Sequence, residues 1–326
     1  MSNSMDQGSS SILGEIAAED FLQHYWQKQP LLIRDALPDY ESPVSPDELA
    51  GLSLESEVES RIVEENGADG PWSVRHGPFE EEDFQGMPER DWTLLVQGVD
   101  LWVPQVKDLL KQFDFLPTWR LDDIMISYAC EGGSVGPHFD QYDVFLLQVE
   151  GQRCWQVGEE CGTGTPLLEG TELRIIEDFK PVQEWLLNPG DMLYLPPGVA
   201  HWGVAESECL TFSIGFRSPT LADMLGDLAV EMITQGHTEH YRDPELTPAM
   251  ASQEIHPAFI EQAKKQLFDL LNDDELISAE NSFIGFKVLA NASGKKVNWV
   301  PMKNYKYNLK AMAEKVTEYT KIIYIA

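Results

Sequence analysis

The sequence predicts a mainly β protein with additional helices, centred on a jelly roll, also called a double-stranded β-helix. Two observations predict this fold. From about Trp119 to Phe216, short runs of β-branched and aromatic residues are separated by Gly and Pro turns, a pattern typical of sheets built from short strands. Within this stretch, two segments far apart in sequence carry histidine or aspartate beside turns, and the facing sheets of a jelly roll can bring such segments together.

An α/β extension is predicted before the jelly roll, over residues 13–100. Residues 15–28 have apolar side chains at helical spacing, and Leu31–Ile33 is a short strand. Ser45 begins a second helix, because Pro46 follows it and Glu48 stands three positions on, the pattern of a capping box. The further elements expected along the chain are a solvated turn at Glu80–Asp83, a strand at Trp92–Val96 and a helix at Val103–Phe113.

The first functional segment ends in His138-Phe139-Asp140 and is followed by Gln141–Val149, which is rich in β-branched and aromatic residues. We expect these residues to form one strand. Residues two positions apart on a strand point to the same face, so His138 and Asp140 can reach one metal ion.

The second functional segment runs from Gly190 to His201. It predicts a tight turn at Asn188–Asp191, a strand at Met192–Leu195, a second turn at Pro196–Gly198 and a further strand opened by His201. Two imidazoles and one carboxylate are the ligand set of non-haem iron(II) oxygenases, so the sequence predicts a metal site of His138, Asp140 and His201.

The glycine, proline and histidine spacing of the two segments resembles both motifs of the cupins. A four-ligand cupin has a second histidine where Asp140 stands and a glutamate where Val144 stands. Val144 cannot bind a metal, so three ligands remain. Three positions of an octahedral ion are then open, which is enough for a bidentate 2-oxo acid and for dioxygen.

Arg153 follows the turn at Gly151 and is expected on a strand antiparallel to the one that carries His138. Its neighbours Cys154, Trp155 and Val157 suggest burial, which is costly for a guanidinium without an anion. The far carboxylate of 2-oxoglutarate is a suitable partner. A surface arginine at a strand edge is the alternative. Ser127, a polar residue in the apolar strand Ile124–Ala129, could contact the same carboxylate or only its own backbone.

These residues resemble the Jumonji-C group of 2-oxoglutarate oxygenases, and within it the bacterial ribosomal oxygenases. The stretches that carry the resemblance are Phe21–Pro30, Ser45–Leu52, His76–Glu80, Met125–Ser127, Val135–Phe145, Leu195–Gly198 and Ser213–Arg217. The resemblance implies iron(II) ligands at His138, Asp140 and His201, and 2-oxoglutarate contacts at Arg153 and Ser127. It also implies a homodimer and the hydroxylation of an arginine in a large-subunit ribosomal protein, with dioxygen as second co-substrate and succinate and CO2 as products.

Two other functions remain open from the sequence. One is a Jumonji-C hydroxylase of another protein residue. The other is a metal-binding cupin without oxygenase activity, although Arg153 and the missing fourth ligand argue against it.

Composition limits the partners. The 326 residues are 43% hydrophobic and carry a formal charge of −32, which disfavours direct nucleic-acid binding and favours a basic protein partner. An acidic surface that serves solubility or salt adaptation is the alternative explanation. No apolar run approaches the roughly 20 residues of a membrane span. Without a signal-peptide pattern or paired cysteine spacing at Cys130, Cys154, Cys161 and Cys209, we expect a cytoplasmic protein.

The domain boundaries follow from these elements. Residues 1–12 are predicted to be a disordered leader and residues 101–218 the Jumonji-C jelly-roll catalytic domain. Residues 219–280 form a helical dimerisation region, with apolar stripes over 221–235 and 258–271. Residues 281–326 hold eight lysines and only two acidic residues, and we interpret this basic tail as a diverged or shortened winged-helix region. Strands at Phe283–Leu289 and Ile322–Ile325 and a helix at Leu309–Tyr319 are expected in it.

Overall fold

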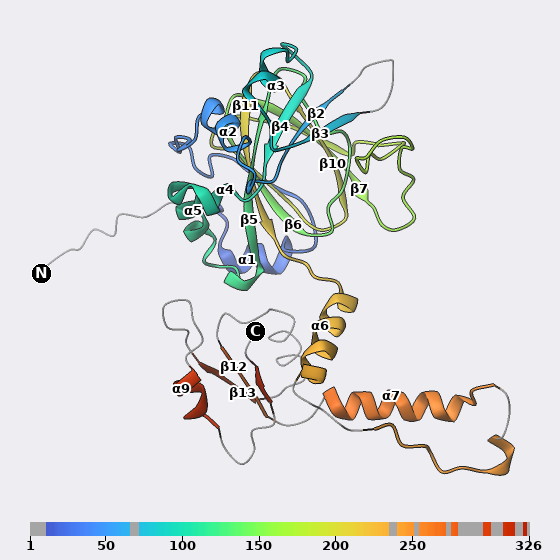
Figure 1. The fold of residues 1–326 in the computed structure, drawn as a ribbon. Helices are drawn as coiled ribbons and strands as arrows, with labels where there is room; N and C mark the ends of the chain where they lie inside the picture. The colour runs from blue at the N-terminus through green and yellow to red at the C-terminus, as the bar shows by residue number, and fades with distance from the viewer. Residues whose placement is uncertain are drawn as a thin grey trace, which may run out of the picture. The chain divides into compact units, whose positions relative to one another are not determined.

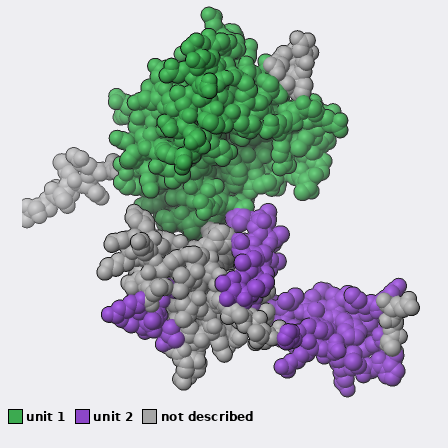
Figure 2. Space-filling view, viewed as in Figure 1, with its two compact units in different colours: residues 1–218 green, residues 219–326 purple. Residues whose placement is uncertain are grey.

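The computed structural model describes residues 11–65, 72–234, 240–250, 254–271, 275–279, 296–300, 309–316 and 322–324. The chain divides into two compact units, Met1–Ser218 and Pro219–Ala326 (Figure 2), and each is described by itself. No helix in the described part of the chain is long and apolar enough to cross a membrane.

Two antiparallel sheets form the centre of the first unit (Figure 1). The larger has the strand order β1-β9-β6-β11-β5-β4-β2-β3 and the smaller the order β10-β7-β8. Their strands are β1 Leu31–Ile33, β2 Ser60–Glu64, β3 Ser73–His76, β4 Trp92–Val96, β5 Leu121–Ala129, β6 Asp143–Glu150, β7 Arg153–Glu160, β8 Gln183–Leu187, β9 Met192–Leu195, β10 Val199–Ala205 and β11 Cys209–Phe216. The prediction of a mainly β protein with helices is confirmed, and β5 to β11 lie in the stretch predicted to form the jelly roll.

Strand β6 is buried on both faces, which explains its nearly continuous apolar sequence. Val144 and Leu146 pack with Trp155 of β7 and with Leu193 and Leu195 of β9. The alternate residues, Phe145 and Leu147, belong to a larger core on the opposite face of the sheet. The face that carries Val144 and Leu146 is the one that also borders the candidate site.

The larger core joins the N-terminal region to the jelly roll through aromatic rings. The ring centroid of Phe21 lies 5.0 Å from that of Tyr194, and the Tyr194 centroid lies 4.8 Å from that of Phe145. Tyr194 also donates a 2.6 Å hydrogen bond to Asp143, which forms a 2.9 Å ion pair with Arg120. Strand β2 pairs with β4, and β4 with β5, so the region before the jelly roll extends its larger sheet.

Several N-terminal predictions are confirmed in place. Strands β1 and β4 have the predicted bounds, and helix α2 (Pro46–Leu52) begins with the predicted capping box. In that box the Glu48 amide donates to Ser45 Oγ at 3.3 Å, and the Ser45 amide donates to Glu48 Oε2 at 2.9 Å. Helix α1 (Ala18–His24) is shorter than the predicted 15–28. Ala17 is extended, with ψ 146°, and Gln27 has a positive φ of 57°, so a right-handed helix cannot run through either of them.

Two other predictions for this region are wrong in detail. The stretch predicted as a solvated turn at Glu80–Asp83 begins helix α3 (Glu81–Gln85), because the Glu80 and Asp83 side chains form a second capping box. The single helix predicted over Val103–Phe113 is divided into α5 (Pro104–Leu109) and the 3₁₀ turn η2 (Leu110–Phe113). The remaining helical segments of the unit are α4 Val99–Trp102 and η3 Thr118–Arg120.

The second unit contains helices α6 (Leu221–Thr234) and α7 (Pro257–Leu271), at the positions predicted from apolar spacing. Most of the predicted α6 stripe is not core, since Leu221 and Leu225 are exposed and Met224 is buried instead. A parallel sheet of order β13-β12-β14 combines two strands of the tail with β12, which precedes the tail. The bounds of the other described elements are η4 Pro248–Met250, β12 Glu275–Ala279, β13 Lys296–Val300, α9 Leu309–Ala313 and β14 Ile322–Tyr324.

Some predictions fall at or beyond the edge of the described residues. The strand predicted at Phe283–Leu289 and residues 1–10 of the predicted leader lie outside them. Ile12, at the end of that predicted leader, is described and is buried in the larger core. The helix predicted over Leu309–Tyr319 is present as α9, which ends at Ala313.

Candidate metal and co-substrate site

The three predicted metal ligands lie together in the structure. One ligand atom each from His138, Asp140 and His201 lies within 4.8 Å of the other two. The ligand segments are joined by a backbone bridge in which the amide of each histidine donates to the carbonyl of the other, at 2.9 and 2.8 Å. The Gly198 amide also donates to the Asp140 carbonyl at 2.7 Å. Local backbone pairing therefore holds the two segments against each other.

The expected strand position of His138 and Asp140 is wrong. Strand β6 begins only at Asp143, and both ligands lie in an extended segment before it. On the other edge of this segment, the Pro137 carbonyl accepts a 2.8 Å bond from the Ile176 amide. His201 is the third residue of β10 rather than its first, beside a β-bulge in the pairing with β7.

Backbone carbonyls orient both imidazole rings. His138 Nδ1 lies 2.8 Å from the Gly136 carbonyl, and His201 Nδ1 lies 2.9 Å from the Val199 carbonyl. A carbonyl only accepts hydrogen bonds, so the proton of each neutral ring is on Nδ1 and the lone pair is on Nε2. Burial, reinforced by the neighbouring His138, lowers the pKa of His201 to about 4. His201 is therefore neutral at physiological pH, the form that binds a metal.

The donor set fits a divalent transition metal. Two Nε2 lone pairs and one carboxylate converge on one point, and carbonyl partners at Nδ1 are the arrangement usual for metal-bound histidines. Asp140 Oδ2 lies 3.7 Å from His201 Nε2. Because His201 is neutral, this contact is not an ion pair, and the carboxylate charge is available to a cation.

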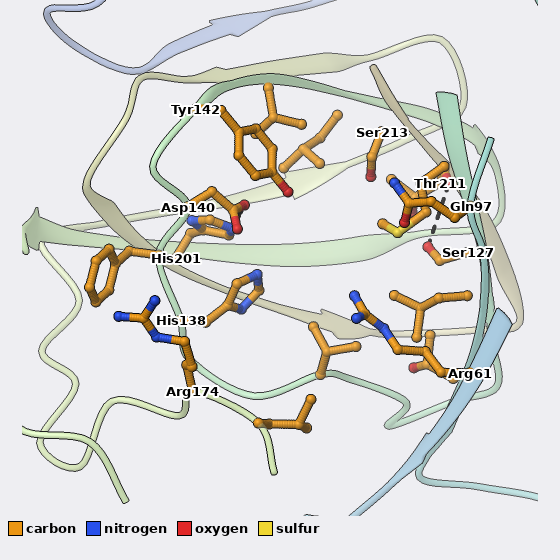
Figure 3. Close-up of a pocket in the computed structure, with 18 of the residues that line it drawn as sticks. Arg61, Gln97, Ser127, His138, Asp140, Tyr142, Arg174, His201, Thr211 and Ser213 are labelled. Carbon is orange, nitrogen blue, oxygen red and sulfur yellow. Dashed lines mark hydrogen bonds and ion pairs between the residues drawn. The ribbon is translucent and has the colours of Figure 1, made fainter. Parts of the chain in front are cut away.

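The three ligands border a cavity of about 440 Å³. Figure 3 shows them on one side of it and Ser127 and Thr211 on the other, with the Arg61 side chain pointing in between. Ser127 lies on β5, Thr211 on β11 and Arg61 on β2. Arg61, Leu95, Ser127 and Thr211 are successive cross-strand partners in the larger sheet, so they form one row on the cavity face.

Arg153 lies in the wall of this cavity and is only 3% exposed. Its Nη1 lies 3.3 Å from Ser127 Oγ and 3.5 Å from Thr211 Oγ1, and its Nη2 lies 3.4 Å from the Gly203 carbonyl. Its Nε has no hydrogen-bond partner. No ion pair joins Arg153 to a carboxylate of the described residues. The prediction of a buried arginine is confirmed, and its long hydrogen bonds leave room for an anion.

Among the described residues, the Cys209 thiol near Arg153 does not supply a counter-charge either. Burial lowers the pKa of Arg153 and raises the pKa of the nearby Cys209 thiol, so that thiol is protonated and neutral. Strand β7, which Arg153 begins, pairs with β10 and β8 and lies in a different sheet from β6. The expectation that Arg153 lies on a strand antiparallel to the one after His138 is therefore wrong, because the antiparallel neighbours of β7 are β8 and β10, and β10 carries His201.

The structure gives Ser127 a backbone contact as well as a contact with Arg153. Ser127 Oγ donates to the Thr211 carbonyl at 3.4 Å and accepts from Arg153 Nη1. Further polar residues of the cavity escaped the sequence reasoning, among them Arg61, Tyr142, Arg174 and Thr211. Thr211 had the same signal as Ser127, a polar residue within an apolar strand. The other three had none, since charged and aromatic residues near turns are common.

The chain is similar in sequence to proteins of a known family. Residues 108–224 match the JmjC domain family. The chain is 39% identical over 258 residues to the ribosomal protein uL16 3-hydroxylase of Escherichia coli, a match that covers 78% of this chain and 68% of that protein. It is 43% identical over 232 residues to a Haemophilus influenzae protein named a probable ribosomal oxygenase, covering 71% of this chain and 55% of that one.

A solved structure is also similar. It is that of YcfD, a ribosomal oxygenase from Escherichia coli, in complex with cobalt and 2-oxoglutarate. It matches with a TM-score of 0.70 and 34% identity, over 91% of this chain and 76% of that chain. The cluster of two histidines and one aspartate, the JmjC match and these relatives together show that the chain belongs to the ribosomal oxygenase family of JmjC-domain proteins.

Proposed function

We propose that this protein is an iron(II)- and 2-oxoglutarate-dependent oxygenase that hydroxylates an arginine side chain of a large-subunit ribosomal protein. One observation carries the proposal. Three metal-binding side chains and a buried arginine without a carboxylate partner among the described residues border the same cavity. A divalent metal and a dicarboxylate are together the simplest complement to those charges.

His138, Asp140 and His201 would hold the metal. The two histidines contribute Nε2 lone pairs that the Gly136 and Val199 carbonyls orient, and Asp140 contributes negative charge. When bound, iron(II) and 2-oxoglutarate supply the oxidising chemistry, with dioxygen consumed and succinate and CO2 released. The protein's own part is to orient these groups and to keep the site dry with apolar cavity residues such as Leu146, Ile175 and Val135.

Arg153 would bind the carboxylate of 2-oxoglutarate farther from the metal. The guanidinium presents a fork of donors, and its Nε is unpartnered while its Nη2 makes only a long contact. Ser127 would either contact the same carboxylate or remain only a hydrogen-bond partner of Arg153, as in the structure. The cavity of about 440 Å³ is large enough for a co-substrate and part of a substrate side chain.

Charge and aromatic surface support an arginine substrate. The E. coli relative is named for hydroxylation of ribosomal protein uL16, and the charge of −32 suits a basic partner. The Tyr142 ring is 41% exposed at the cavity and offers a face to a cation. We expect the target guanidinium to enter beside Tyr142 and Asp140, away from Arg61 and Arg174, because like charges repel.

The proposal includes a homodimer that forms through the helices after the jelly roll, and a cytoplasmic location with no direct contact to nucleic acid. Exposed apolar residues on α6 support the dimer.

The test is iron(II)-dependent conversion of 2-oxoglutarate to succinate, with and without the basic ribosomal protein. Succinate formation that this protein stimulates, together with an arginine-containing peptide heavier by one oxygen atom, would establish the function. Turnover that the ribosomal protein does not stimulate would support oxygenase activity but reject that protein as the substrate. Mass spectrometry of ribosomal proteins from a deletion strain then separates arginine from another residue as the target. Absence of turnover in folded, iron-loaded protein would favour a cupin without oxygenase activity.

A further inference from the structure

Gln148 is a buried polar residue outside the cavity that is linked to Arg153 through Thr211. Its side chain on β6 is fully buried, at 0% exposure, and is not among the cavity-lining residues. Thr211 Oγ1 lies 3.0 Å from Gln148 Oε1 and 3.5 Å from Arg153 Nη1. A continuous chain of polar contacts therefore runs from Gln148 on β6, through Thr211 on β11, to the guanidinium of Arg153.

The backbone fixes the orientation of the Gln148 amide. Its Nε2 donates to the Glu150 carbonyl at 2.8 Å and to the Leu210 carbonyl at 3.4 Å. Both carbonyls lie beside a β-bulge in the pairing of β6 with β11, where Leu210 is opposite Glu150 and Thr211 is opposite Gln148. Since two acceptors surround Nε2, a reversed amide would place oxygen against oxygen. Oε1 must therefore face Thr211.

This orientation decides which way the Thr211 hydroxyl points. A hydroxyl has one hydrogen to donate, and Gln148 Oε1 can only accept it. Thr211 Oγ1 therefore turns its lone pairs toward Arg153 Nη1. Ser127 donates its own hydrogen to the Thr211 carbonyl and likewise presents lone pairs to Nη1. Two acceptors hold Nη1, and Nη2 makes only a long contact to the Gly203 carbonyl, so the guanidinium keeps donor capacity for a ligand.

We propose that Gln148 is a positioning residue for the co-substrate: through Thr211 it orients Arg153 to bind the far carboxylate of 2-oxoglutarate. The inference rests on the proposed function, since it assigns that carboxylate to Arg153. Without Gln148, the Thr211 hydrogen is free to turn toward the guanidinium, which then loses an acceptor and its fixed orientation. Co-substrate affinity falls although no residue in contact with the co-substrate has changed.

The experiment is a double-mutant cycle on the full chain, read as the Kd for 2-oxoglutarate by titration calorimetry with Mn(II) in place of iron. Gln148→Met and Thr211→Val each weaken binding roughly fivefold, the loss of about one net hydrogen bond. Because both act on the same contact, the double variant is expected to bind like Thr211→Val alone. KM for 2-oxoglutarate rises by a similar factor in turnover assays, with kcat retained.

Three comparisons make the cycle specific. Gln156→Met changes a glutamine on β7 whose amide bonds Glu184 at an exposed position, and it should leave the Kd unchanged. Gln148→Asn keeps an amide for the backbone carbonyls but is shorter, so it breaks the bond to Thr211 even if the Met variant does not fold. Arg153→Ala loses at least roughly tenfold in affinity, because contacts to a charged group are lost.

The outcomes separate the two proposals. If the wild-type protein does not bind 2-oxoglutarate, the proposed function fails and the inference fails with it. If Arg153→Ala loses affinity while folded Gln148→Met or Gln148→Asn binds like the wild type, the role of Gln148 alone is wrong. Fold-changes that multiply in the double variant would also overturn it, since Gln148 would then act independently of Thr211.

Discussion

At the scale of single residues, the candidate site is organised by short-range partners that orient its ligands. Each histidine ring bonds the carbonyl two residues before it, at Gly136 and at Val199. Each carbonyl is presented by a backbone that turns at a nearby glycine with positive φ, Gly136 itself and Gly198. The metal site is therefore held by backbone geometry more than by other side chains.

The most direct residue-scale prediction concerns Asp140. Asp140→Ala is expected to abolish 2-oxoglutarate turnover while the melting temperature stays close to that of the wild type. The carboxylate is the only charged group of the triad, yet it lies in a segment outside the strands. Succinate formation and thermal unfolding measure the two effects. Asp178→Ala, at an exposed acid paired with Lys180, is the control. Near-normal turnover would show that Asp140 is not a metal ligand.

Gly203 supplies the space that Arg153 occupies. A Cβ at this position would lie 2.7 Å from the Trp155 ring and 2.9 Å from Arg153 Nε. Gly203→Ala is therefore expected to weaken 2-oxoglutarate binding and to destabilise the protein by about 1–3 kcal/mol, the range for overpacking. Gly215→Ala on β11 is the matched control, since its nearest contact would be 3.6 Å. Equal behaviour of the two variants in calorimetry and denaturant unfolding would contradict this account.

At the scale of elements, capping and turn residues predicted the bounds of an element better than apolar spacing did. The capping box at Ser45 and the strand at Met192–Leu195 were found in place, because each depends on a few adjacent residues. The 15–28 helix was predicted too long and the β6 strand was predicted to begin too early, since apolar spacing continues past points where the backbone turns. Gln27, with its positive φ, and the bend at residues 141–142 are such points.

Helix α2 offers a test of the capping box. Ser45→Ala is expected to cost about 1 kcal/mol of unfolding free energy, the usual loss for a cap hydrogen bond. Ser56→Ala, at an exposed serine beyond the helix, is expected to be neutral. The hydrogen bonds from Ser45 lower the pKa of Glu48. A carboxyl whose pKa is lowered by folding stabilises above its unfolded pKa and loses this as the pH falls through the folded value. The Ser45→Ala deficit should therefore shrink below about pH 4. A deficit independent of pH in urea titrations would exclude the Glu48 contribution.

At the scale of the whole molecule, the formal charge of −32 makes the encounter with a basic substrate sensitive to salt. We expect KM for the basic ribosomal protein to rise steeply between low salt and roughly 0.3 M salt, because surface charges are screened over about 10 Å at 0.1 M. KM for 2-oxoglutarate should change much less, since Arg153 is buried. Parallel salt dependence of the two constants would show that the net charge does not steer the protein substrate.

The exposed apolar side of α6 leads to a prediction about assembly. Leu221 and Ile233 are each 77% exposed, and Leu225 and Val230 of the same helix are exposed as well. Several exposed apolar residues on one element mark a contact surface. We expect a homodimer in light scattering, converted to a monomer by Leu225→Asp with Ile233→Asp. Leu101→Asp, at an exposed leucine of α4, should leave the dimer intact. A wild-type monomer at micromolar concentration would reject the dimer.

The sequence by itself determined the mainly β architecture, the cluster of His138, Asp140 and His201, and the burial of Arg153. These follow from three kinds of signal: apolar residues at alternate positions of a strand, turn residues, and residue types such as histidine and aspartate that are typical metal ligands. Only the tertiary structure decided which residues share the cavity with them. Arg61 and Thr211 line it beside Ser127, and Gln148 lies just outside it. These four residues come from four strands and are aligned by the cross-strand register of a single sheet. Register depends on long-range pairing, so no local pattern in any one strand reveals it.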